Sequence, residues 1–200
     1  MKKLIFTFFL FFALTSVAQE KYRGIGIGHI QSRFSEHPPF ELFGSSFENL
    51  KVNILGVFYK STIAFNNGRR NSMFALSMCP FLGLAYSSNA NNQSSPREVV
   101  FGREVSMEFP ILFEYYIGGL DETNFFLSAG GTINALFFDG GWRGITPDFG
   151  PQIGLGAQFE INESRLIGIK GTYTFGQIGR LTVIDESSSI SFGVYYSLDY

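Results

Sequence analysis

A small group of polar residues early in the chain comes nearest to a catalytic set. His29 and His37 are the only histidines, and Ser32 and Glu36 lie close to them in the sequence. Serine, histidine and a carboxylate are the side chains of a nucleophilic triad. Their spacing matches no hydrolase motif, and these residue types are common in loops. We therefore expect no catalytic residues, with a triad at one rim of the fold as the alternative.

Paired carboxylates are a second source of chemistry. Glu104 and Glu108 are four residues apart, which on an extended strand places them about 13 Å apart. That distance is too long for a general acid and a general base to act on one atom. These carboxylates do not predict an acid–base site.

Metal and cofactor sites have little support. Cys79 is the only cysteine, so no internal disulfide can form, and the two histidines show no ligand spacing. Cys79 is expected to be a small core residue. The glycines follow no phosphate-binding pattern. We expect no metal site and no cofactor.

The element that must position all these residues is a β-strand, and the last segment of the chain shows it best. From residue 190 the sequence alternates strictly to the final residue. The even positions are Ile190, Phe192, Val194, Tyr196, Leu198 and Tyr200; the odd ones are Ser191, Gly193, Tyr195, Ser197 and Asp199. Period-two alternation predicts a strand with one apolar and one polar face.

The beginning of the chain has the features of a secretory signal peptide. Lys2 and Lys3 precede an apolar run over residues 4–14, and Ser16-Val17-Ala18 supplies small residues at a cleavage site. The run is too short for a transmembrane helix, which needs about 20 residues. We expect residues 1–18 to be removed and residues 19–200 to form one domain.

Composition argues against nucleic-acid binding. Without Lys2 and Lys3 the chain has 13 basic and 17 acidic residues. No basic stretch could follow a phosphate backbone.

Seven further segments alternate like the last one. The eight expected strands are residues 21–31, 50–65, 72–86, 103–117, 124–138, 149–161, 166–175 and 188–200. The connections after the second, fourth and sixth strands are short and carry turn residues: 66–71, 118–123 and 162–165. The others are longer: 32–49, 87–102, 139–148 and 176–187.

The apolar rows are expected to face lipid and the polar rows to face a lumen. In the second segment this places Leu50, Val52, Ile54 and Phe58 outward, and Lys60 then requires a bulge. The expected lumen charges are Lys51, Glu104, Glu108, Glu114, Glu160, Lys170 and Asp199. They form either a structural ion-pair and water network or an ion path.

An even number of strands with short turns at one end and long loops at the other is typical of a bacterial outer-membrane barrel. The sequence therefore predicts an all-β fold, an eight-stranded antiparallel up-and-down transmembrane β-barrel, with both termini in the periplasm. Eight strands leave a lumen that side chains fill. A soluble β-sandwich also alternates and is the alternative.

Several stretches are similar to one known family. Ala18-Gln19, the segment Met107-Glu108-Phe109-Pro110-Ile111-Leu112-Phe113-Glu114-Tyr115-Tyr116, the segment 149–156 and the terminal Tyr200 resemble the small PorT-like outer-membrane β-barrels of Bacteroidota. The resemblance implies fold and outer-membrane location more than activity. Some relatives belong to secretion machinery, but no residue here carries that role across.

These observations favour a non-enzymatic barrel with a structural or surface-interaction role. The expected partners are outer-membrane lipid, the insertion machinery through the strand ending at Tyr200, and a protein at the long loops. The first loop holds Phe34, Phe40, Phe43 and Phe47, and the third holds Trp142 and Arg143. Trp142 could join Tyr86, Phe137 and Phe175 in an aromatic belt. A lipid-modifying enzyme and a secretion or transport accessory are the alternatives.

Overall fold

The structure is a computed structural model. It describes residues 20–42, 45–65, 73–92, 95–99, 105–118, 123–137, 148–162, 165–176 and 186–198. The expected signal peptide, Glu104, Trp142, Arg143, Asp199 and Tyr200 lie outside these ranges, as do the side chains of residues 34–50. Within the described part of the chain, no helix is long and apolar enough to cross a membrane.

All described secondary structure is extended. The strands are β1 (Glu20–Leu42), β2 (Ser45–Ala64), β3 (Phe74–Met78), β4 (Phe81–Asn92), β5 (Ser95–Val99), β6 (Val105–Ile117), β7 (Asn124–Phe137), β8 (Asp148–Asn162), β9 (Arg165–Thr174) and β10 (Glu186–Leu198). Every pairing among them is antiparallel.

The ten strands occupy eight strand positions around the wall of a barrel, and we call each position a stave. β3 and β4 are one strand, because β2 and β6 keep the same register on both sides of the Cys79–Pro80 step. Pro80 has no N–H to donate, while the Cys79 N–H donates to Pro110 O at 3.2 Å. β5 and β6 pair with successive parts of β4 and form another stave.

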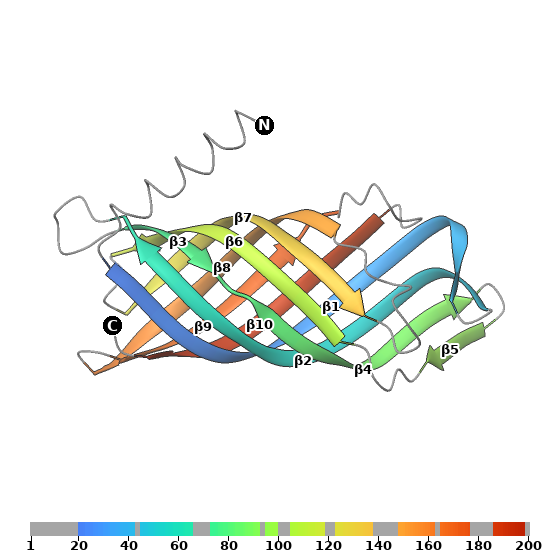
Figure 1. The fold of residues 1–200 in the computed structure, drawn as a ribbon, viewed down its shortest axis with the longest axis horizontal. Helices are drawn as coiled ribbons and strands as arrows, with labels where there is room; N and C mark the ends of the chain where they lie inside the picture. Colours follow the sequence, from blue (N-terminus) through green and yellow to red (C-terminus); the bar gives the residue numbers. More distant parts are fainter. Residues whose placement is uncertain are drawn as a thin grey trace, which may run out of the picture.

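The sheet closes on itself through the first and last strands. β1 pairs with β2 on one edge and with β10 on the other (Figure 1). Following ladder partners around the barrel leads from Tyr22 through Thr62, Ser77, Leu112, Gly130, Gln152, Thr174 and Ser189 to Ser32. Ser32 is ten residues along β1 from Tyr22. Eight staves with a shear of ten tilt by about 40° to the axis, as membrane barrels do. The expected fold class is confirmed.

The alternation of side chains also follows the expectation on most staves. On β6, Phe109, Ile111 and Phe113 are exposed on the outer wall, whereas Glu108 and Glu114 are buried in the lumen. The same division holds on β1, on β9 and on the described part of β10. Exposed apolar rows of this kind suit contact with lipid rather than water.

On β2 the expected facing is wrong. Val52, Ile54 and Phe58 are buried, while Leu55 and Val57 are exposed. The β1–β2 ladder runs without a shift from Glu20↔Ala64 to Ser35↔Asn49, so no bulge occurs near Lys60. Lys60 belongs to the buried row and lies inside the barrel. The lumen row of this strand is largely apolar because its side chains fill the core.

Large rings in the lumen lie against glycines on neighbouring strands. A Cβ atom at Gly26 would lie 2.5 Å from the Phe58 ring, and one at Gly168 would lie 2.0 Å from the Tyr195 ring. Each of these glycines is the direct ladder partner of the ring residue, so its missing side chain leaves the volume that the ring occupies.

Two of the expected long loops are largely strand. β1 and β2 continue through most of residues 32–49 as a paired hairpin, with one irregularity between Ser35 and Phe40. β4 and β5 form a second hairpin within residues 87–102. Both hairpins extend beyond the barrel at the right of Figure 1. Residues 138–147 and 177–185 lie outside the described part.

The opposite end of the barrel is marked by the first and last strands. Arg23 pairs with Leu198, so β1 begins and β10 ends side by side. We call this the termini end and the opposite one the hairpin end.

Candidate functional site

The lumen near the termini end is closed by a buried ion pair. Lys60 Nζ lies 2.9 Å from Glu114 Oε2, and both side chains are almost fully buried. Glu114 also accepts a hydrogen bond from the Tyr116 hydroxyl, and Lys60 Nζ donates to that hydroxyl at 3.1 Å. Lysine and carboxylate buried together must compensate each other, because an isolated charge in the core is very costly.

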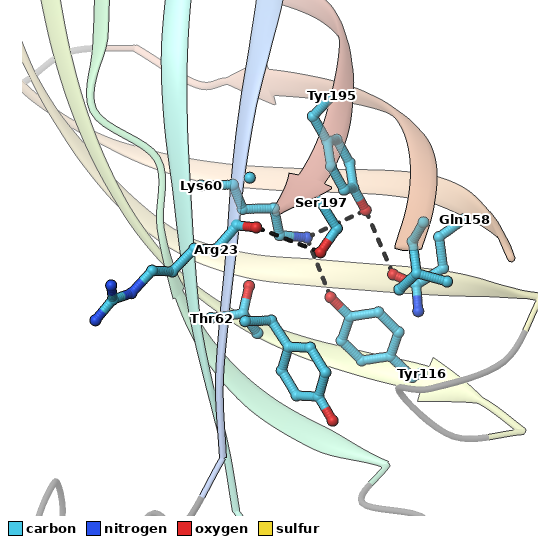
Figure 2. Close-up of a pocket in the computed structure, with 10 residues that line it drawn as sticks. Arg23, Lys60, Thr62, Tyr116, Gln158, Tyr195 and Ser197 are labelled. Atoms are coloured by element: carbon cyan, nitrogen blue, oxygen red, sulfur yellow. Dashed lines mark hydrogen bonds between the residues drawn. The ribbon is translucent and has the colours of Figure 1, made fainter. Parts of the chain in front are cut away.

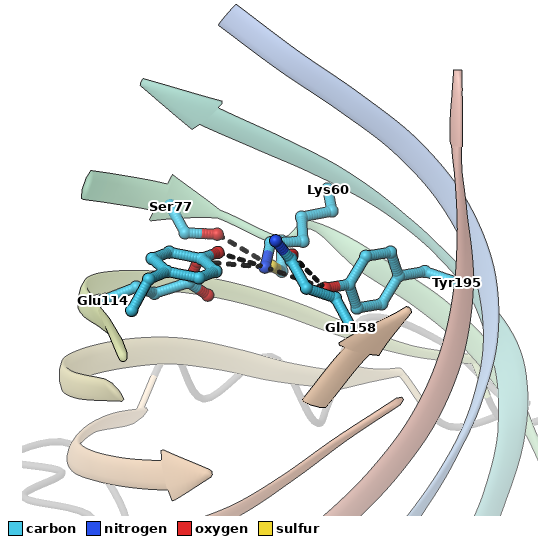
Figure 3. Close-up of polar contacts among 7 residues, drawn as sticks. Lys60, Ser77, Glu114, Gln158 and Tyr195 are labelled. Carbon is cyan, nitrogen blue, oxygen red and sulfur yellow. Dashed lines mark hydrogen bonds and ion pairs between the residues drawn. The ribbon is translucent and has the colours of Figure 1, made fainter. Parts of the chain in front are cut away.

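Aromatic rings and a glutamine complete the shell around the ammonium group. Lys60 Nζ donates to the Tyr195 hydroxyl at 3.5 Å, and Tyr195 donates to Gln158 Oε1 at 3.4 Å (Figure 3). The ammonium lies 4.5 Å from the Phe126 ring centroid and 4.7 Å from that of Tyr195. Cation–π contacts of this kind add to the hydrogen bonds. The network joins β2, β6, β7, β8 and β10 across the lumen.

Little free space remains beside this network. The cavity that it borders has a volume of ≈ 20 Å³ and is lined in part by Thr62, Gln158 and Ser197 (Figure 2). A cavity of this size holds about one water molecule. In the described part of the lumen, the Lys60–Glu114 network acts as a plug.

A second polar layer lies closer to the hairpin end. Glu108, Lys170 and Gln152 line a cavity of ≈ 30 Å³, large enough for about two water molecules. Lys170 Nζ lies 5.6 Å from the Phe58 ring centroid, and Gln152 donates to Thr174 Oγ1 at 3.0 Å. The Lys60–Glu114 ion pair, rather than this second layer, supports the interpretation of the lumen charges as a structural network.

Not all the expected lumen charges are there. Lys51 is exposed on the outer row of β2, because the facing of that strand is reversed. Glu160 lies at the rim of the termini end and is exposed. Glu108, Glu114 and Lys170 lie in the lumen as expected. Cys79 is also buried there, with its Sγ 3.4 Å from Ser77 Oγ.

The possible triad is not assembled by the residues that the structure describes. His29 lies on the outer row of β1, where its Nε2 is 3.0 Å from the Tyr86 hydroxyl. Ser32 is buried on the opposite face. The two side chains therefore point to different sides of the wall. The side chains of Glu36 and His37 lie outside the described part, and no metal-binding cluster occurs within it.

Sequence reasoning missed Lys60 and Tyr116 as the centre of the lumen site. Lys60 itself was the available signal, since a lysine in an otherwise apolar row points to a lumen-facing row rather than to a bulge. Tyr116 lies two residues after Glu114, on the polar row of the alternation, so its inward facing could have been predicted from the sequence.

Comparisons with known proteins agree with this architecture. The chain matches no protein-family model, and no curated protein sequence matches it. Among solved structures, it is similar to the outer membrane protein OprG from Pseudomonas aeruginosa, with 10% sequence identity and a TM-score of 0.58, covering 90% of this chain and 95% of that one. The chain therefore has the fold of the small outer-membrane β-barrels. Neisserial surface protein A has the same fold, with 8% identity, a TM-score of 0.55, and coverage of 91% and 100%.

Proposed function

We propose that this chain is a non-enzymatic outer-membrane protein that acts at the cell surface through its long hairpins. The observation that carries the proposal is the length of β1 and β2, which have 23 and 20 residues. About 10 residues suffice to cross a membrane in a tilted strand. The remainder is a paired extension that would project beyond the lipid.

A basic pair at the base of this hairpin supports a surface contact. Arg33 and Lys51 are directly opposite each other in the β1–β2 ladder, and both are exposed on the outer row. Like charges in this position destabilise a sheet unless an anion lies between them. They fit a protein or cell-surface partner with a negatively charged patch.

The closed lumen disfavours the transport alternative. The described lumen holds the Lys60–Glu114 plug and the small cavities next to it, which are too small for a solute larger than water. The enzyme alternative needs a convergent polar set, and His29 and Ser32 face opposite sides of the wall.

The proposal includes the route to the membrane. Residues 1–18 would direct export and be cleaved, and β10 with Tyr200 would present the terminal strand to the insertion machinery. Membership of the PorT-like barrels fits this route and remains part of the proposal.

Photo-crosslinking in whole cells tests the surface role. A photoreactive phenylalanine analogue at Asn49 reports on the hairpin, and the same analogue at Leu155 on the lipid face is the control. We expect a discrete adduct from position 49 only, reduced in an Arg33→Gln/Lys51→Gln background. Absence of an adduct at position 49, or the same adduct at position 155, would contradict the proposal.

A further inference from the structure

An apolar groove crosses the outer wall of the barrel. Its volume is ≈ 810 Å³, within the usual range for ligand sites. It runs between two rows of outward side chains. The first row is Ile167, Tyr196, Ile25, Tyr59, Pro80 and Phe109, and the second is Val194, Ile27, Val57, Leu82 and Met107.

The ladder gives the shape of this groove. Its floor is the backbone of the intervening residues, which face the lumen: Tyr195, Gly26, Phe58 and Phe81 are successive ladder partners. The two rows are two residues apart along each strand, a spacing of about 6.7 Å. Six staves contribute, so the groove is about 24 Å long. The groove is therefore long and narrow.

The groove has a defined direction. The ladder places Met107, its last residue on β6, near the hairpin end of the wall, while Ile167 on β9 is two residues from the start of that strand. The groove therefore rises obliquely from the termini end toward the hairpin end. The end of the groove at Ile167 therefore lies close to the rim of the barrel at the termini end.

Two arginines lie between the groove and the rim at the termini end. Arg165 is two residues before Ile167 on β9, and Arg23 is two residues before Ile25 on β1. Both are exposed on the outer face. Figure 2 shows the Arg23 side chain directed away from the lumen residues. The phenolic side chains of Tyr59 and Tyr196 flank Ile25 in the ladder.

The shape of the groove and the positive charges of the two arginines indicate which ligand it binds. A twofold dimer would bring the same concave surface of both copies together, and two grooves cannot fill each other. A linear hydrocarbon chain suits an apolar groove that is long and narrow. Arginine guanidinium groups bind phosphate oxygens at the membrane surface. We propose that the groove binds one phospholipid of the leaflet at the termini end, with an acyl chain in the groove and its phosphate at Arg23 and Arg165.

Native mass spectrometry of the full-length protein extracted from membranes tests this site. The probe is dipalmitoyl phosphatidylglycerol; hexadecanol supplies a chain without phosphate, and glycerol phosphate supplies the phosphate without a chain. Val57→Trp narrows the groove, and Leu155→Trp places the same ring on β8 outside it. Arg23→Gln removes one cation, and Lys51→Gln removes an exposed cation at the other end.

We expect the unsubstituted protein to retain one phosphatidylglycerol and neither partial probe. Loss of one arginine near an anionic lipid should lower the retained fraction about fivefold, and Val57→Trp should lower it as well. Leu155→Trp and Lys51→Gln should leave it unchanged. The proposal is overturned by no retained lipid, by equal retention in Val57→Trp and Leu155→Trp, by equal retention of hexadecanol, or by a dimer that Val57→Trp dissociates.

Discussion

The buried Lys60–Glu114 pair makes the free energy of unfolding sensitive to the substitution of either of two side chains. Their side-chain exposures are 5% and 0%. Each charge is tolerated because the other, the Tyr116 hydroxyl and the surrounding rings compensate for lost water. The pair joins β2 to β6, which lie on either side of β3. It therefore acts as a cross-brace in the lumen.

Removing the lysine alone should be costly. Lys60→Met leaves the Glu114 carboxylate buried without its cation, and we expect a loss of about 3–5 kcal/mol in the free energy of unfolding. Lys51→Met, which removes an exposed lysine from the same strand, should change it by less than about 0.5 kcal/mol. Urea titration in lipid vesicles measures both. Lys60→Met/Glu114→Leu should regain most of the loss.

Equal stability of Lys60→Met and Lys51→Met would show that the lumen pair contributes nothing. A double variant no more stable than Lys60→Met would show that the stranded carboxylate is not the cause.

Substitution of two glycines on β9 can distinguish the effect of side-chain packing on stability from the effect of the backbone. A Cβ at Gly168 would lie 2.0 Å from the Tyr195 ring, whereas one at Gly171 has Ser191 O at 3.7 Å as its nearest neighbour. Gly168→Ala should therefore destabilise the barrel by about 1–3 kcal/mol by displacing the ring. Gly171→Ala should be neutral in the same urea titration. Equal effects of the two substitutions would contradict ring-against-glycine packing.

At the scale of the strand, β2 shows what alternation can and cannot predict. The sequence correctly predicts that residues 50–65 form a strand with two distinct rows. It does not tell which row faces lipid, because Val52, Ile54 and Phe58 are as apolar as Leu55 and Val57. The facing is decided by the neighbours: Phe58 occupies volume left by Gly26 on β1, and that contact depends on the register.

The β1–β2 hairpin should be separable from the barrel. The ladder pairs Ser35 with Asn49, so replacing residues 36–48 by Asn-Gly makes a two-residue hairpin in register. We expect this variant to fold, as read by a band that shifts on heating. Deleting Ile27 alone should abolish folding, because it turns the residues on one side of the deletion to the opposite face within the barrel wall. Failure of the hairpin deletion to fold would mean that the extension is part of the barrel core.

For the whole molecule, the sequence predicted the architecture but not its interior contacts. Strand number, alternation and terminal pattern are local features repeated along the chain, so the barrel could be recognised from them. The plug depends on Lys60, Glu114 and Tyr195, which are far apart in sequence and meet only when the sheet closes. The sequence spacing of these three residues does not predict that they are in contact.

The closed lumen predicts an electrically silent barrel. With the Lys60–Glu114 plug and cavities of ≈ 20 and ≈ 30 Å³ beside the charged residues, planar bilayers containing the protein should show no stable large openings. An Arg33→Gln/Lys51→Gln variant should be equally silent because those residues lie outside the lumen. Stable large conductance steps in the unsubstituted protein would show that the lumen is open.

If this chain is an outer-membrane barrel, its exposed apolar rows face lipid. The most direct test is electrophoresis of the outer-membrane fraction with and without heating. We expect to find the protein in that fraction as a compact band that shifts on boiling, since a closed barrel resists unfolding by detergent. A soluble periplasmic protein with no shift would mean that these rows are covered by something other than lipid and that the chain is not a membrane barrel.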